Sequence, residues 1–153
     1  MPYDAIETAY EARPKNMTPL LDATHYAKLE GACGDTDEFW LRIDAGRIRR
    51  VTFLSNGCEA AVACCAATAG LAEGSKPEKA KALTPEDVLR KVGPLSPDHR
   101  HCARLAIDAL WLALTEGEIP PKRSLLNRLK RRILRSERTP NASDDSTPKG
   151  KTA

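Results

Sequence analysis

The sequence of 153 residues predicts an α+β fold, a small three-stranded antiparallel sheet backed by helices, with an extra basic helix towards the C-terminus. Three observations lead to this prediction. Apolar and polar residues alternate within residues 36–55, as they do in half-buried strands. Alanine, the strongest helix former, is dense after Cys58. Lys and Arg are concentrated beyond Pro120-Pro121.

The strands are predicted first. Apolar residues alternate with polar neighbours from Phe39 to Ile43, a turn of Asp, Ala and Gly follows at residues 44–46, and the alternation then resumes. This pattern is typical of a β-hairpin. Residues 26–32 form a weaker candidate strand beside it, which completes a three-stranded antiparallel sheet.

Helices are predicted on both sides of these strands. Residues 3–12 can form a short helix that ends at Arg13, because the residue before a proline avoids helical backbone angles. The alanine-rich segment that begins at Cys58 is predicted to be a helix that stops at Gly74.

Two further helices begin with residues that favour helix N-termini. Thr84-Pro85 and Ser96-Pro97 each place a hydroxyl cap before a proline in the first turn. The second of these helices runs to about Gly117 and carries one apolar face at helical spacing. That face consists of Leu105, Ala109, Leu112 and Ala113.

The distribution of charge divides the chain. Residues 1–117 carry 14 basic and 17 acidic side chains, a net charge of −3, whereas residues 118–153 carry 10 and 4, a net charge of +6. We therefore predict one domain over residues 1–117, a basic amphipathic helix over 118–138 and a disordered tail over 139–153. The partner of the basic helix is left open between an acidic protein, anionic lipid, nucleic acid and its own domain.

The cysteines indicate metal or redox chemistry. The chain contains no apolar run near the ~18–20 residues that span a bilayer, and its first residues do not resemble a signal peptide. We therefore expect a cytoplasmic protein without a transmembrane segment. Five cysteines, an odd number, in a reducing compartment argue against a disulfide framework.

Three of the cysteines lie at predicted ends of strands or helices. Cys33 follows a strand between glycines, Cys58 begins the alanine-rich helix, and Cys102 lies in the first turn of the last long helix beside His101. The start of a helix favours the thiolate, which is the form that binds metal. No C-x-x-C pair is present, and the adjacent Cys64-Cys65 are predicted to pack in the core. The residues alone leave the use of this thiol site open.

Three motifs carry a resemblance to a known family. The segment from Gly34 through Asn56 continues as Gly-Cys-Glu-Ala-Ala-Val-Ala at residues 57–63, and His101-Cys102-Ala103 opens the last helix. Residues 13–17, Arg-Pro-Lys-Asn-Met, add a further likeness ahead of these motifs. In chain order, these segments resemble the IscU/NifU-type iron–sulfur cluster assembly scaffolds, the NifU N-terminal domain family, over about residues 3–117.

The resemblance implies a site and a function. The ligands of the family fall on Cys33, Asp35, Cys58 and Cys102, with His101 as an alternative ligand. They would hold iron and a transient 2Fe–2S cluster, and Cys102 would accept the persulfide sulfur. Asp35 is a hard ligand that bonds cluster iron more weakly than a thiolate does, which suits a cluster that must leave.

The resemblance also implies partners. They are a cysteine desulfurase and recipient apoproteins, and the chain itself is not expected to be an enzyme. The dedicated chaperone of some members is not expected, because residues 95–99 keep only part of its Leu-Pro-Pro-Val-Lys signal. Two alternatives remain, a zinc-bound sulfurtransferase and a structural zinc domain with an interaction tail. The sequence does not separate zinc from a cluster, since both bind the same thiols, and zinc is an alternative occupant of the isolated protein.

Overall fold

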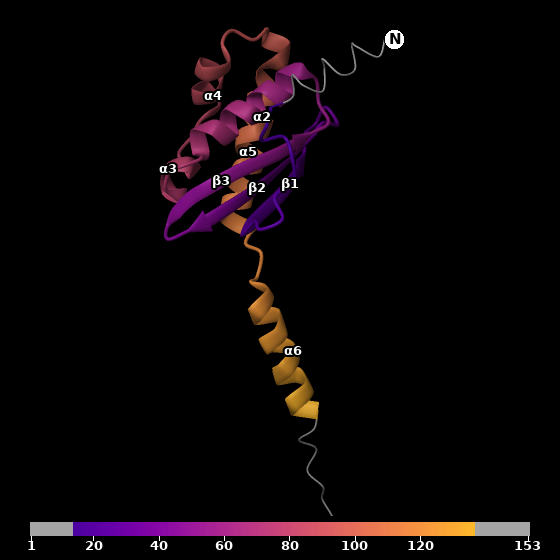
Figure 1. Cartoon of the computed structure of the whole chain (residues 1–153). Helices are drawn as coiled ribbons and strands as arrows, with labels where there is room; N and C mark the ends of the chain where they lie inside the picture. The colour runs from indigo at the N-terminus through magenta and orange to yellow at the C-terminus, as the bar shows by residue number, and fades with distance from the viewer. Residues whose placement is uncertain (1–13, 137–153) are drawn as a thin grey trace, which may run out of the picture. The chain divides into compact units, whose positions relative to one another are not determined.

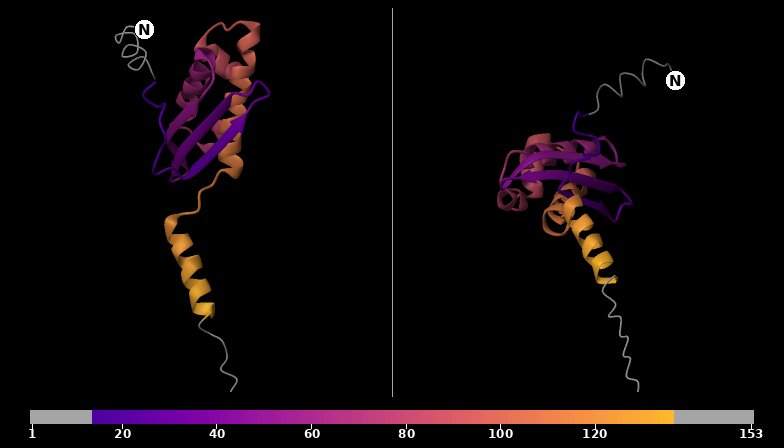
Figure 2. Two further views of the ribbon diagram at one scale, coloured as in Figure 1. Left: turned by 90° about the vertical axis from the view of Figure 1, so that its right-hand side faces the viewer. Right: turned by 60° about the horizontal axis from the view of Figure 1, so that its bottom comes forward.

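The computed structural model describes residues 14–136 and contains a three-stranded antiparallel sheet in the order β1-β2-β3. Figure 1 and Figure 2 show helices α2 to α5 on one face of this sheet. The predicted α+β class is confirmed. The elements are β1 His25–Glu30, β2 Thr36–Asp44, β3 Arg47–Ser55, α2 Glu59–Ala72, α3 Pro77–Lys81, α4 Pro85–Val92, the 3-10 turn η1 Pro97–His99, α5 Arg100–Glu116 and α6 Lys122–Ser136.

The hairpin of β2 and β3 forms as the alternation predicts. Phe39 pairs with Phe53 across the two strands. The turn uses left-handed backbone angles at Ala45 (φ 49°) and Gly46 (φ 73°), the geometry that matches the twist of a two-residue hairpin. Strand β1, which was predicted over residues 26–32, ends earlier, at Glu30, because the chain turns at Gly31.

The core lies between the sheet and two helices lined with small residues. Phe39, Leu41 and Phe53 are fully buried on the helix-facing side of the sheet. Half of the buried residues of α2 and α5 are alanine, which lets helix and sheet backbones approach closely. The short helix α3 was not predicted from the sequence.

Both outer edges of the sheet are paired with other segments. The backbone N–H of Ile48 on β3 donates to the carbonyl of Ser75 (2.9 Å). Residues 117–119 run beside β1, where the N–H of Tyr26 donates to the carbonyl of Gly117 (2.8 Å). Unpaired strand edges invite association with other chains, and these bonds remove that hazard.

The chain divides into two compact units, residues 1–119 and residues 120–153. The second unit contains α6, which lies within the predicted basic helix over 118–138. The predicted helix over 3–12 and the predicted disordered tail over 139–153 fall outside the described residues. Within residues 14–136, no helix has the length and the apolar character needed to cross a bilayer.

A chain truncated after Ile119 should keep the fold of the first unit, because the division between the units falls there. We expect its free energy of unfolding in urea to lie within about 1 kcal/mol of the full chain. Truncation after Glu116 is the control, since it also removes the bonds of residues 117–119 to β1 and should cost about 1–3 kcal/mol. Equal losses in the two truncations would contradict the prediction.

Candidate metal centre

The loop between β1 and β2 presents Cys33 and Asp35. The N–H of Gly31 donates to the carbonyl of Asp35 (2.8 Å), and the N–H of Gly34 donates back to Gly31 (3.0 Å). Gly34 adopts a φ of +86°, which a residue with a side chain rarely adopts. The tight turn leaves the Cys33 side chain exposed and the Asp35 side chain half-buried.

The loop between β3 and α2 is fastened to this first loop. The side-chain oxygen of Asn56 accepts a hydrogen bond from the N–H of Thr36 (2.6 Å). A Cβ atom on Gly57 would lie only 2.9 Å from Oδ2 of Asp35 and 2.6 Å from Cβ of Ala61. Gly57 therefore allows the Asp35 carboxylate to lie directly against the loop that carries Cys58.

A buried carboxyl group supports the loop between β3 and α2. Asp37 is fully buried, and its Oδ1 accepts a hydrogen bond from the hydroxyl of Ser55 (2.7 Å). The Ser55 hydroxyl oxygen in turn accepts the N–H of Gly57 (3.2 Å). Burial raises the pKa of Asp37, and the hydrogen bond from Ser55 partly opposes that rise. Asp37 thus positions the residue before Cys58.

The sequence analysis missed Asp37 and Ser55. Asp37 occupies the same alternating register as Phe39 and Leu41, so the period of the strand did place it on the buried face. A carboxylate at such a position is rare unless it has hydrogen-bond partners, and this was the signal that could have identified it.

Helix α5 brings His101 and Cys102 to the same end of the molecule. The turn η1 precedes the helix, so both residues lie in its first turn. His101 is exposed, whereas Cys102 is only 2% exposed. The Nε2 atom of His101 lies 3.8 Å from the Cys102 sulfur.

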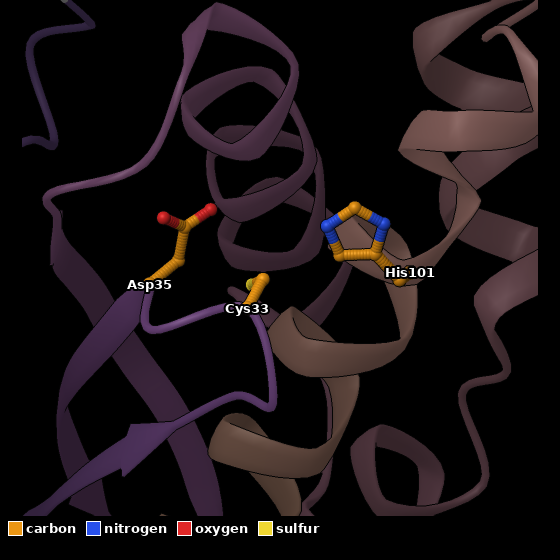
Figure 3. Close-up of side chains that lie close together, drawn as sticks. All are labelled: Cys33, Asp35 and His101. Carbon is orange, nitrogen blue, oxygen red and sulfur yellow. The ribbon is translucent and has the colours of Figure 1, made fainter.

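Cys33, Asp35 and His101 converge. One ligand atom from each, a sulfur, a carboxylate oxygen and a ring nitrogen, lies within 4.8 Å of the other two. Figure 3 shows the three side chains turned towards a common space between the β1–β2 loop and α5. Sulfur, oxygen and nitrogen donors at this separation can bind one metal ion.

Cys58 and Cys102 lie outside this group of three but beside each other. Burial, and then the neighbouring Cys58 thiol, raises the pKa of Cys102 to about 12. Asp35 acts on Cys102 in the same direction. Cys58 is the N-cap of α2, and its exposed side chain makes no capping hydrogen bond. Its thiol is therefore available to a ligand at the positive end of the helix dipole.

Cys64 and Cys65 belong to the core. Both are fully buried on α2. Burial, followed by the Asp37 carboxylate, raises the pKa of Cys64 to about 11, and the same two causes raise the pKa of Cys65. Protonated and enclosed, these thiols pack as small apolar groups.

A groove opens next to the exposed thiol. It runs between the β1–β2 loop and α5, from Gly31 and Cys33 past His101 to Leu105. Arg104 lines it and is held by Asp108, with its Nε 3.0 Å from the Oδ2 atom of the carboxylate. The Cys33 side of the site is thus the accessible side.

The chain is similar to proteins of one family. The family model described as the NifU-like N terminal domain matches residues 5–119. The iron–sulfur cluster assembly scaffold protein IscU 1 of Archaeoglobus fulgidus is 30% identical over 104 residues, which cover 67% of this chain and 68% of that protein. The nitrogen fixation protein NifU of Cereibacter sphaeroides is 36% identical over 107 residues, 69% of this chain but 43% of that protein.

A solved structure shares the fold. The crystal structure of a putative iron–sulfur cluster assembly scaffold protein for the SUF system, from Fervidobacterium islandicum AW-1, superimposes with a TM-score of 0.57. The match covers 71% of this chain and 93% of that one, at 16% sequence identity. At this identity the likeness concerns the fold alone.

The five thiols should differ in reactivity in the folded, metal-free protein. Cys33 and Cys58 are exposed, whereas Cys102 is buried with a raised pKa of about 12. At about pH 7.5, iodoacetamide should modify Cys102 at least about a hundredfold more slowly than Cys33, because the thiolate is the reacting species. Pulsed alkylation with mass spectrometry measures the rates, and in denaturant all five should react alike. Equal rates for Cys33 and Cys102 in the folded protein would contradict this geometry.

Proposed function

The chain belongs to the family of NifU-like N-terminal domains, and from that premise we propose that it is a scaffold on which an iron–sulfur cluster is assembled and then passed to another protein. The observation that carries this proposal is the convergence of Cys33, Asp35 and His101 beside the paired thiols of Cys58 and Cys102. The cluster is the cargo of this site, so the protein carries out no catalytic turnover of its own.

Cys33, Asp35, Cys58 and Cys102 are the proposed ligands of a 2Fe–2S cluster, with His101 as the alternative to Asp35. Such a cluster takes four protein ligands, and this site offers five donor side chains. Because Asp35 and His101 both lie within 4.8 Å of the Cys33 sulfur, one can replace the other without a large movement. An excess donor supports exchange of ligands, which release of a cluster requires.

Sulfur enters by transfer from a persulfide on a cysteine desulfurase. A thiolate of the scaffold attacks the terminal sulfur, the sulfur–sulfur bond of the donor breaks, and the donor leaves as a thiolate while the scaffold becomes the persulfide. Cys102 is the proposed acceptor. Since its thiol is 2% exposed, acceptance requires the first turn of α5 or the β1–β2 loop to open. The groove beside Cys33 supports an approach of the donor from that side.

Zinc is the second candidate occupant of the site. The group formed by Cys33, Asp35 and His101 favours it. A sulfur, an oxygen and a nitrogen donor within 4.8 Å of one another suit a single tetrahedral ion completed by one further thiol. A zinc-bound sulfurtransferase would use the same donors and take the persulfide on one of them. A structural zinc domain would differ only in that its metal never leaves.

The partners follow from the proposed function. They are a cysteine desulfurase that supplies sulfur and apoproteins that receive the cluster, with no dedicated chaperone. All five cysteines are free, which supports a reducing compartment such as the cytoplasm.

Anaerobic reconstitution with iron, cysteine and a desulfurase should give the visible sulfur-to-iron absorption of a 2Fe–2S cluster. Cys33→Ser, Cys58→Ser and Cys102→Ser should each lower the amount of stable cluster at least about tenfold, because each removes a soft ligand. The matched controls are Cys64→Ala and Cys65→Ala, which remove buried thiols of the core. Loss of the cluster in a control alone would place the site elsewhere. Retention of stoichiometric zinc without colour in the wild type would favour the zinc functions.

Asp35→Ala and Asp35→Cys should slow transfer of the cluster to an apo-ferredoxin by about tenfold or more. Both changes remove the hard oxygen donor, and the second replaces it with a soft one that binds iron more strongly. Asp35 lies in a turn and is half-buried, so both variants should fold. The control is Asp98→Ala, which changes an exposed aspartate in η1. Transfer at the wild-type rate in both variants would exclude Asp35 from the mechanism of release.

A further inference from the structure

Helix α6 has no evident role in the proposed metal site, and its charge is one-sided. Residues 122–136 contain seven Lys or Arg and no Asp or Glu. The described ion pairs join Arg42 to Asp22, Arg90 to Asp87 and Arg104 to Asp108, and none includes a side chain of residues 127–134, the part of α6 whose side chains the structure describes. The cations of the helix therefore have no acidic residue within the helix itself to neutralise them.

The same helix exposes large apolar side chains. Leu129 is 54% exposed and Leu134 is 62% exposed. At about 100° per residue, Leu129 and Ile133 share one side of the helix, and Arg131 lies on the opposite side. Leu134 lies about 100° from Ile133, at the border between the apolar side and the basic side. A helix with leucines on one side and arginines on the other is the amphipathic type that binds at the surface of a membrane.

We propose that α6 is an interfacial anchor that lies on a lipid surface containing anionic headgroups. The headgroups match the cations, and the acyl region takes the leucines of the other side. A nucleic acid would satisfy the cations but leave Leu129 and Leu134 in water, and the helix carries no aromatic residue on which a base could stack. The anionic bilayer is the occupant that uses both halves of the helix.

The length and composition of α6 define the kind of attachment. Its 15 residues extend about 22 Å as a helix, which is less than the ~30 Å of a hydrocarbon core. The helix therefore lies on the membrane, and without Trp or Phe it binds reversibly. Residues 1–117 carry a net charge of −3 and are repelled by the same surface. The attachment is thus confined to the basic unit, independently of any cluster on the first unit.

The test uses the full chain, free of metal, and sedimentation with vesicles. We expect binding to vesicles of phosphatidylcholine and phosphatidylglycerol in equal parts, little binding to phosphatidylcholine alone, and weaker binding as salt is raised. Helical circular dichroism should increase on binding, because an isolated helix of this length is marginal in water.

Two double variants separate the contributions of charge and apolar contact. Arg131→Gln with Arg132→Gln should weaken binding about thirtyfold, and Leu129→Ser with Leu134→Ser by about tenfold or more. The matched controls lie on the first unit. They are Arg49→Gln with Arg50→Gln on exposed positions of β3, and Leu21→Ser, at a side chain that is 101% exposed. Both controls should bind as the wild type does.

Three results would overturn the proposal. The first is no binding to the anionic vesicles. The second is unchanged binding by the Leu129→Ser, Leu134→Ser variant, which would leave only a non-specific attraction of charges. The third concerns single-stranded polyuridine. If the leucine variant binds polyuridine as tightly as the wild type does, and polyuridine fully displaces the protein from vesicles, the partner of α6 is a nucleic acid.

Discussion

The close contact of α2 with α5 and the sheet is the constraint on which the rest of the structure depends. Both helices face the core with alanines that are fully or almost fully buried, such as Ala61 and Ala69 on α2 and Ala103 and Ala106 on α5. Small side chains let the backbones approach, so the first turns of both helices reach the β1–β2 loop at one end of the molecule. Larger residues at these positions would force the layers apart at a cost of about 1–3 kcal/mol each. The first turns of both helices consequently lie at the thiols, and at Cys102 the effect of burial outweighs that of the helix dipole, because the pKa of this thiol is raised to about 12.

The loops at this end are positioned by hydrogen bonds between residues that are not themselves proposed ligands. Asp37 is a fully buried carboxyl group with one oxygen, Oδ2, that lacks a partner, and leaving such an oxygen unpaired is unfavourable for folding. Its other oxygen bonds Ser55, which holds the N–H of Gly57. Gly57 in turn is the residue whose missing side chain lets Asp35 lie against the Cys58 loop. The unfavourable burial of a carboxyl group is thus tied to the placement of two proposed ligands.

The sequence predicted the elements of the fold where the pattern is local. For the site, it predicted which residues take part but not how they are arranged. The alternation from Phe39 to Ile43 and the turn at residues 44–46 predicted β2, β3 and their hairpin, whereas the register shift between Arg42 and Ile43 depends on packing. Spacing and resemblance indicated the three thiols at element ends. They did not indicate that Cys102 is buried while Cys33 is exposed, because burial depends on how α5 packs beneath the β1–β2 loop. Ligation by these residues stays a prediction.

The different exposure of the two sides of the site suits the proposed scaffold. Cys102 is enclosed by protein, so water and competing thiols reach it slowly, whereas Cys33 and His101 border an open groove. The alternative donor His101 borders this groove, and the hard Asp35 oxygen lies within 4.8 Å of the Cys33 sulfur, so the proposed donors that exchange most readily lie next to the side that a recipient can reach. A cluster held this way would be released from the Cys33 side first, with Cys102 as its last ligand. Uniform burial would slow release, and uniform exposure would leave the cluster open to water, so the unequal depth of the thiols supports the proposed function.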